Sequence, residues 1–197
     1  MNNLQLVEKD TAILKEMIAN MPDYLDSRAT HWTLPQPNMP KLTIGGCLMR
    51  LHRLQAIYQD LPLGLQQQIK RSAQQFDDAL KERIVRFEVR ATEELHDRLS
   101  EWCSYLRYIK TQAAGNDDYY QRIVDTRVVI AALVHKLSQK PFRLDPSATD
   151  EMTQFDKLLQ SIWQPGEFIW EPVWRPAYPP EPYWFLYGFP KTAVEKS

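Results

Sequence analysis

Apolar residues recur every three or four positions along most of the chain before residue 163, the spacing that places them on one face of an α-helix. This pattern predicts helices at about residues 3–21, 43–60, 63–111, 118–138 and 146–163. Prolines such as Pro22, Pro62 and Pro141 stand where the apolar periodicity stops, as expected at helix ends. Because no segment alternates between apolar and polar residues, no β-strand is predicted, and the expected fold class is all-α.

The longest predicted helix runs from residue 63 to about residue 111. It contains no proline, and its only glycine is Gly64, at its start. Its apolar residues return every eleven positions, as in the series Leu65, Phe76 and Phe87. An eleven-residue repeat keeps one face aligned along a nearly straight helix. The sequence therefore predicts one continuous helix about 70 Å long at the centre of an elongated antiparallel bundle.

Residues 22–42 carry four prolines and are predicted to form a long connection. Loops of this length are uncommon inside a compact domain. Five apolar residues indicate that this one packs against the core: Tyr24, Leu25, Trp32, Leu34 and Met39.

The C-terminal segment, residues 164–197, differs in composition from the helical domain predicted for residues 1–163. Seven of the fourteen prolines and ten aromatic residues fall between Trp163 and Pro190. The prolines exclude a helix, and the sequence from Pro176 to Pro182 predicts polyproline II structure, which aromatic grooves of partner proteins recognise. Because so many aromatic side chains are too apolar to remain in water, we expect the segment to pack on its own helices or on a partner. Six of these side chains are the candidate partner-binding residues: Trp170, Trp174, Tyr178, Tyr183, Trp184 and Tyr187.

Charge and composition narrow the classes of partner. The 24 basic and 25 acidic residues nearly balance, which argues against nucleic-acid binding. The N-terminus does not resemble a secretory signal, and the longest apolar run, Val128 to Val134, is too short to cross a bilayer. Cys47 and Cys103 have no metal-ligand spacing and are predicted to be free thiols of a cytoplasmic protein, with one disulfide as the alternative.

Short motifs that could carry chemistry have simpler structural interpretations. Glu93 and His96 match a Glu-x-x-His metal motif, but helical geometry turns both away from the apolar face. Gly45 and Gly46 are explained by a helix start, because the lysine of a phosphate-binding loop is missing. We therefore predict no catalytic residue, no metal and no cofactor.

The predicted function is that of a non-enzymatic structural or protein-interaction module that associates with another protein or with itself. The alternative is an enzyme or a small-ligand-binding bundle with a cavity near His135 and His52. His52 lies between Arg50 and Arg53, where it could help to bind an anion. His135 follows the apolar run at Val128–Val134 and is predicted to be desolvated.

Overall fold

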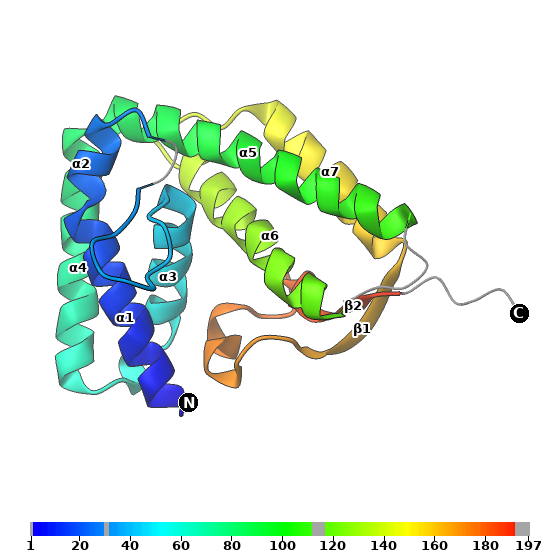
Figure 1. Ribbon diagram of the computed structural model, residues 1–197, viewed down its shortest axis with the longest axis horizontal. Helices are drawn as coiled ribbons and strands as arrows, with labels where there is room; N and C mark the ends of the chain where they lie inside the picture. The colour runs from blue at the N-terminus through cyan, green and yellow to red at the C-terminus, as the bar shows by residue number, and fades with distance from the viewer. Residues whose placement is uncertain (1, 30–31, 112–116, 192–197) are drawn as a thin grey trace, which may run out of the picture. The chain divides into compact units, whose positions relative to one another are not determined.

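The computed structural model describes residues 2–29, 32–111 and 117–191, which are mostly helical as predicted (Figure 1). The chain divides into two compact units, Met1–Glu94 and Leu95–Ser197.

The first unit is built from helices α1 to α4 and the start of α5. α1 (Asn3–Ala19) packs against both α3 (Ile44–Ala56) and α4 (Leu63–Glu82), as Figure 1 shows. A capping box starts α1, because the Asn2 side chain accepts a hydrogen bond from the Gln5 backbone while the Gln5 side chain accepts one from the Asn2 backbone. The apolar face that the sequence predicts is buried, with Leu14 and Met17 fully covered.

The prediction of a single long helix at residues 63–111 is wrong. Two helices occupy this stretch, α4 and α5 (Ile84–Thr111). Helical geometry is interrupted at Arg83, where φ is −129° and ψ is 37°. Neither proline nor glycine is present, so side-chain contacts rather than backbone propensity account for the interruption.

Two phenylalanine rings show that the chain bends at Arg83. Phe76 of α4 and Phe87 of α5 are eleven residues apart, which on a straight helix separates them by about 16 Å along the axis. Their ring centroids are instead 6.3 Å apart in an edge-on contact, and both rings are buried. Phe76 and Phe87, two members of the eleven-residue repeat, therefore meet on the inner side of a bend.

The predicted connection at residues 22–42 begins with a short helix that the sequence did not reveal, α2 (Met21–Asp26). Pro22 lies in the first turn of α2, where its missing N–H is tolerated, so it opens this helix as well as following α1. The prediction that the connection packs on the core is confirmed for Tyr24, Leu25 and Leu34, each less than 5% exposed.

The second unit contains the rest of α5, then α6 (Asp117–Leu137) and α7 (Pro146–Gln160). The Asp145 side chain caps α7 by accepting a hydrogen bond from the Ser147 backbone. The apolar run in α6 is buried at Val128, Val129, Ile130 and Leu133.

The C-terminal segment forms an unpredicted two-stranded antiparallel hairpin, β1 (Trp163–Phe168) and β2 (Tyr187–Pro190). Prolines fit these strands because each strand of a two-stranded sheet is an edge. Gly188 has φ of +133°, and a Cβ atom there would lie 2.1 Å from the Gln164 carbonyl oxygen, so only glycine suits this position.

The polyproline II prediction is also wrong. Residues Pro172–Ala177 form the 3-10 helix η2, and a turn follows before the short 3-10 helix η3 (Trp184–Leu186).

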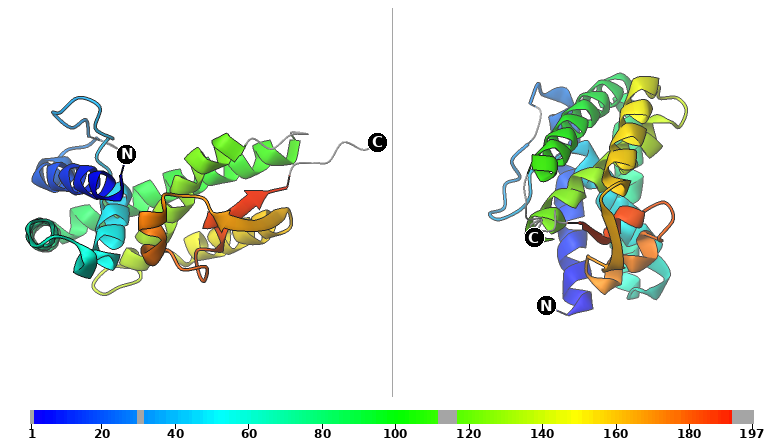
Figure 2. Two further views of the ribbon diagram at one scale, coloured as in Figure 1. Left: turned by 90° about the horizontal axis from the view of Figure 1, so that it is seen from below. Right: turned by 90° about the vertical axis from the view of Figure 1, so that its right-hand side faces the viewer.

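This segment packs on α6 in the same chain, which the views in Figure 2 show from two further sides. The Tyr120 hydroxyl donates a 2.6 Å hydrogen bond to the Phe185 carbonyl oxygen. The Arg127 guanidinium lies 4.6 Å from the centre of the Phe185 ring, which is fully buried. The segment therefore contributes to the core of the second unit.

Replacing Phe185 by alanine should lower the free energy of unfolding by about 3–5 kcal/mol, because it removes a fully buried ring. Urea denaturation followed by tryptophan fluorescence measures this, since five of the six tryptophans lie in the second unit. Glu171→Ala, at an exposed position of the same segment, should change stability by less than about 0.5 kcal/mol. Equal stability of the Phe185→Ala variant and the wild type would contradict a core role for the segment.

Candidate functional site

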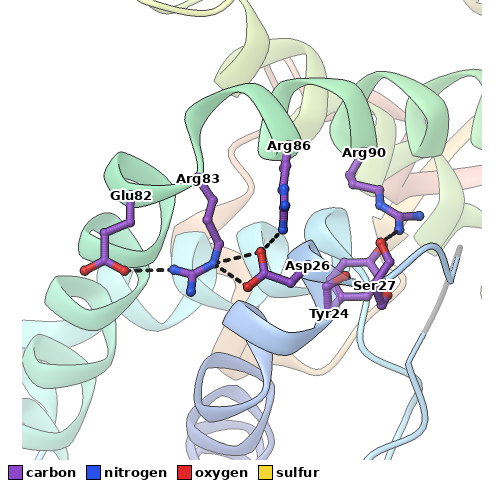
Figure 3. A network of polar contacts seen from close by, with 7 residues as sticks. All are labelled: Tyr24, Asp26, Ser27, Glu82, Arg83, Arg86 and Arg90. Atoms are coloured by element: carbon purple, nitrogen blue, oxygen red, sulfur yellow. Dashed lines mark hydrogen bonds and ion pairs between the residues drawn. The ribbon is translucent and has the colours of Figure 1, made fainter.

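The bend at Arg83 brings together charged side chains from α2, α4 and α5 (Figure 3). The Arg83 Nε donates hydrogen bonds to both carboxylate oxygens of Asp26, the last residue of α2, at 3.2 Å each. Arg86 binds the same carboxylate through Nη1. Arg83 also contacts Glu82 through Nη1, at 2.8 Å. One carboxylate is thus shared by Arg83, which lies between α4 and α5, and Arg86, in the first turn of α5.

A third arginine, Arg90, holds the chain that follows α2. Its Nη1 donates to the Ala29 carbonyl oxygen at 2.6 Å, and its Nη2 donates to the Ser27 carbonyl oxygen. The guanidinium also lies 5.7 Å from the centre of the Tyr24 ring. Arg86 and Arg90 are four residues apart on α5, so they share one side of this helix. Together with Arg83 they meet the same end of α2.

The arginines keep Asp26 ionised. Partial desolvation raises the pKa of the Asp26 carboxyl, but the hydrogen bonds and charges of Arg83 and Arg86 outweigh it and lower the pKa below its ordinary value of 3.8. The site therefore binds a carboxylate of the chain itself.

A hollow of about 730 Å³ opens to solvent at this bend. The residues that line it define the bend groove: Asp26, Lys81, Glu82, Arg83, Ile84, Val85 and Arg86.

An apolar ridge borders the bend groove. Val85 is 70% exposed, and Val89, one turn further along α5, is 51% exposed. Most large apolar side chains of this unit are buried, so two exposed valines four residues apart distinguish this surface. The groove combines a pair of carboxylate-binding arginines with apolar contact area.

The sequence did not reveal this site because charges of both signs are interspersed over residues 81–88, a pattern typical of a solvated helix face. The sequence held two indications of the site. Arg83, Arg86 and Arg90 are spaced by three and four residues, and Val85 and Val89 lie outside the apolar face of the helix. The partner carboxylate, Asp26, lies 57 residues before Arg83 and had no local signature.

The six predicted aromatic residues lie within the folded C-terminal segment. Trp174 and Tyr178 are buried, and the other four are half-buried. Trp170 and Tyr183 place their rings 5.2 and 5.0 Å from the Tyr178 ring, and the Tyr187 hydroxyl donates to the Tyr178 carbonyl oxygen at 2.7 Å. Trp184 contacts Trp163 at 5.2 Å instead. The structure thus brings most of them together around Tyr178, and their role in binding a partner stays a prediction.

The two candidate histidines are exposed and belong to different units, His52 to the first and His135 to the second. The prediction that His135 is desolvated is wrong, because it faces solvent on α6, with its Nε2 at 2.9 Å from the Gln139 side-chain nitrogen. Neither histidine lines the bend groove.

The backbone at the start of α3 binds a carboxylate of the same unit through a glycine N–H group. The Gly45 backbone N–H donates to Glu94 Oε2 at 2.9 Å, and the Gly46 N–H donates to the Thr43 hydroxyl at 3.0 Å. The buried Glu94 carboxylate thus lies at the N-terminus of α3, where the helix dipole favours a negative charge.

The cysteines show no sign of nucleophilic reactivity. Both are free thiols, and burial raises the pKa of the Cys47 thiol, which keeps it protonated. Cys103 is half-buried.

Three further ion pairs have little exposure and join helices. Asp10 of α1 binds Arg50 at 3.2 Å and also Arg53, both from α3. Arg127 of α6 binds Asp156 of α7 through two hydrogen bonds, of 2.9 and 2.7 Å. Since each pair connects neighbouring helices and has little exposure, we assign all three a structural role.

The described residues show neither a metal-binding cluster nor a membrane-spanning helix. Glu93 and His96 are exposed, as the helical geometry predicted. Within residues 2–29, 32–111 and 117–191, no group of three acidic, histidine or cysteine side chains could hold a metal ion. In the same ranges no helix combines the length and the apolar character needed to cross a membrane.

Asp156→Ala should lower the free energy of unfolding by about 3–5 kcal/mol, because Arg127 would stay buried without its carboxylate. The double variant Arg127→Met, Asp156→Ala should recover most of this loss, since an apolar pair has no charge to desolvate. Urea denaturation of both variants checks this. If Asp156→Ala lowers the free energy of unfolding by less than about 1 kcal/mol, the pair behaves as an exposed one and the structural role is contradicted.

The Asp26 network should make stability depend on pH. The lowered pKa means that the carboxylate stabilises the folded state above pH 3.8, and that this contribution disappears as the pH falls below that value through the folded-state pKa. Thermal midpoints of the wild type should therefore exceed those of Asp26→Asn at neutral pH, and the difference should vanish in acid. A difference that grows on acidification would show that Asp26 is not held by the arginines.

Comparison of the chain with models of protein families, with curated proteins and with solved structures finds no significant match.

Proposed function

We propose that this chain is a non-enzymatic protein-interaction module that binds a segment of another protein in the bend groove. The observation that carries the proposal is the exposed pair Val85 and Val89 beside a hollow of about 730 Å³. Single exposed apolar side chains are common on protein surfaces. A pair at helical spacing next to a hollow offers a contiguous surface that a bound segment would cover.

The groove is suited to binding rather than to catalysis. Its lining consists of ionic and aliphatic side chains, without a histidine, cysteine or serine among them. Asp26, the carboxyl that two arginines contact, has its pKa lowered, the direction opposite to that of a general acid acting near neutral pH. These features support recognition of a charged segment.

The bend groove is a better candidate surface than the aromatic residues of the C-terminal segment. Those side chains are buried or half-buried against their own unit, whereas Val85 is 70% exposed. A single helix of about 70 Å would have offered length for self-association beyond what its shorter neighbours cover, but the helix is divided at Arg83. We therefore propose a different protein as the partner.

Selection from a library of random displayed peptides tests the proposal. Peptides selected on the full chain should bind about tenfold more weakly to the double variant Val85→Ser, Val89→Ser, because the proposal makes these two valines the central apolar contact and a combined loss of about 1.4 kcal/mol is tenfold in affinity. Fluorescence anisotropy with the selected peptides measures the affinities.

Leu63→Ser is the matched control, since Leu63 is 69% exposed and starts α4, at the other end of that 20-residue helix from the bend. Binding should be unchanged in this variant. If the valine variant binds the selected peptides as tightly as the wild type, the proposal fails. It also fails if sedimentation shows wild-type dimers that the valine variant cannot form, because the groove would then bind a second copy.

A further inference from the structure

We propose that the partner segment of the bend groove is acidic and that Asp26 competes with it, from within the chain, for Arg83 and Arg86. This inference rests on the proposed function, since it names the chemistry of the segment that the groove binds.

The geometry of Asp26 shows what the arginines can bind. Both of its oxygens accept from Arg83, and one also accepts from Arg86. Two guanidinium groups that converge on one carboxylate form a site for that chemical group, whichever chain supplies it.

The ionic contact is accessible from solvent. The Asp26 side chain is 42% exposed and the Arg86 side chain is 58% exposed. Exposed ion pairs contribute little to stability, so a ligand carboxylate can replace Asp26 at a small energetic cost. The buried pair of Arg127 and Asp156, with side chains 6% and 20% exposed, does not offer this exchange.

The charge of the groove favours an acidic ligand over a basic one. Three cations line it, Lys81, Arg83 and Arg86, against the two carboxylates Asp26 and Glu82. When Asp26 leaves the arginines, Arg83 still contacts Glu82, which is 69% exposed, and Lys81 lies 3.8 Å from Asp78. A basic segment would have to approach the two guanidinium groups that Asp26 had neutralised, whereas an acidic one would replace Asp26 there.

The apolar ridge adds a second requirement. Ile84 and Val85 line the same hollow as the arginines, and Val89 continues the ridge on α5. A segment whose carboxylate reaches Arg86 would therefore place a neighbouring side chain on these residues. The expected ligand has an aliphatic residue next to an aspartate or glutamate.

Peptide titrations of the ¹⁵N-labelled full chain by NMR test the inference. The probe is a capped six-residue peptide in which aspartate alternates with leucine, and its matched control has asparagine in place of aspartate. The acidic peptide should shift amide signals around residues 81–89. Asp26→Asn should bind it about threefold to fivefold more tightly, since the competing charge is removed while both arginines stay.

Arg86→Gln should bind the acidic peptide about threefold to fivefold more weakly than the wild type, and raising the salt concentration should weaken binding to the wild type. The neutral peptide should be insensitive to both substitutions. Thermal midpoints at the same pH establish that each variant is folded.

Two results overturn the inference. Equal or weaker binding of the acidic peptide by Asp26→Asn would show that Asp26 is not a competitor. Failure of the acidic peptide to bind any variant at millimolar concentration, or equal binding of the neutral peptide, would show that the groove does not recognise carboxylates. The proposed function would survive these results if the library-selected peptides still depended on Val85 and Val89.

Discussion

The contact between the rings of Phe76 and Phe87 is the constraint on which the first unit depends. It fixes a bend between α4 and α5, because residues eleven apart on a straight helix cannot bring their rings to 6.3 Å. The bend lets the buried faces of both helices contribute to one core, which also holds Leu80 and Ala91. It also aims Arg83 and Arg86 at the end of α2, so the hydrophobic contact positions the polar site.

Burial divides the ion pairs of this chain into two kinds. Asp10 with its two arginines, and Arg127 with Asp156, have little exposure, and breaking such a pair costs about 3–5 kcal/mol. The pairs of Asp26 are far more exposed, where an ion pair contributes about 0–1 kcal/mol. The buried pairs fix helices in place, whereas the exposed pairs at the bend contribute little to the stability of the fold. This difference is consistent with the proposal that the arginines at the bend bind a partner.

Helical periodicity predicted the fold class and the approximate positions of five helical stretches, since a buried face leaves its spacing in the sequence. Three features escaped it for physical reasons. The bend at Arg83 has no proline or glycine and depends on the tertiary contact between Phe76 and Phe87. Pro22 follows one helix and opens another. The hairpin contains prolines that only an edge strand tolerates. The arginine spacing of the site was visible in the sequence, but its carboxylate was not, because long-range contacts have no local pattern.

The C-terminal segment shows why composition alone was a poor guide to the functional surface. Its prolines lie mostly exposed, at Pro172, Pro176, Pro179 and Pro182, while Trp174, Tyr178 and Phe185 point inward. The prolines restrict the backbone of the segment, and contacts of Tyr120 and Arg127 with Phe185 hold it against α6. An unusual density of aromatic residues is therefore explained by folding within the second unit. Among the described residues, Val85 and Val89 are large apolar side chains that folding leaves exposed, and their place beside the Asp26 ion pairs supports the proposal of a binding surface at the bend.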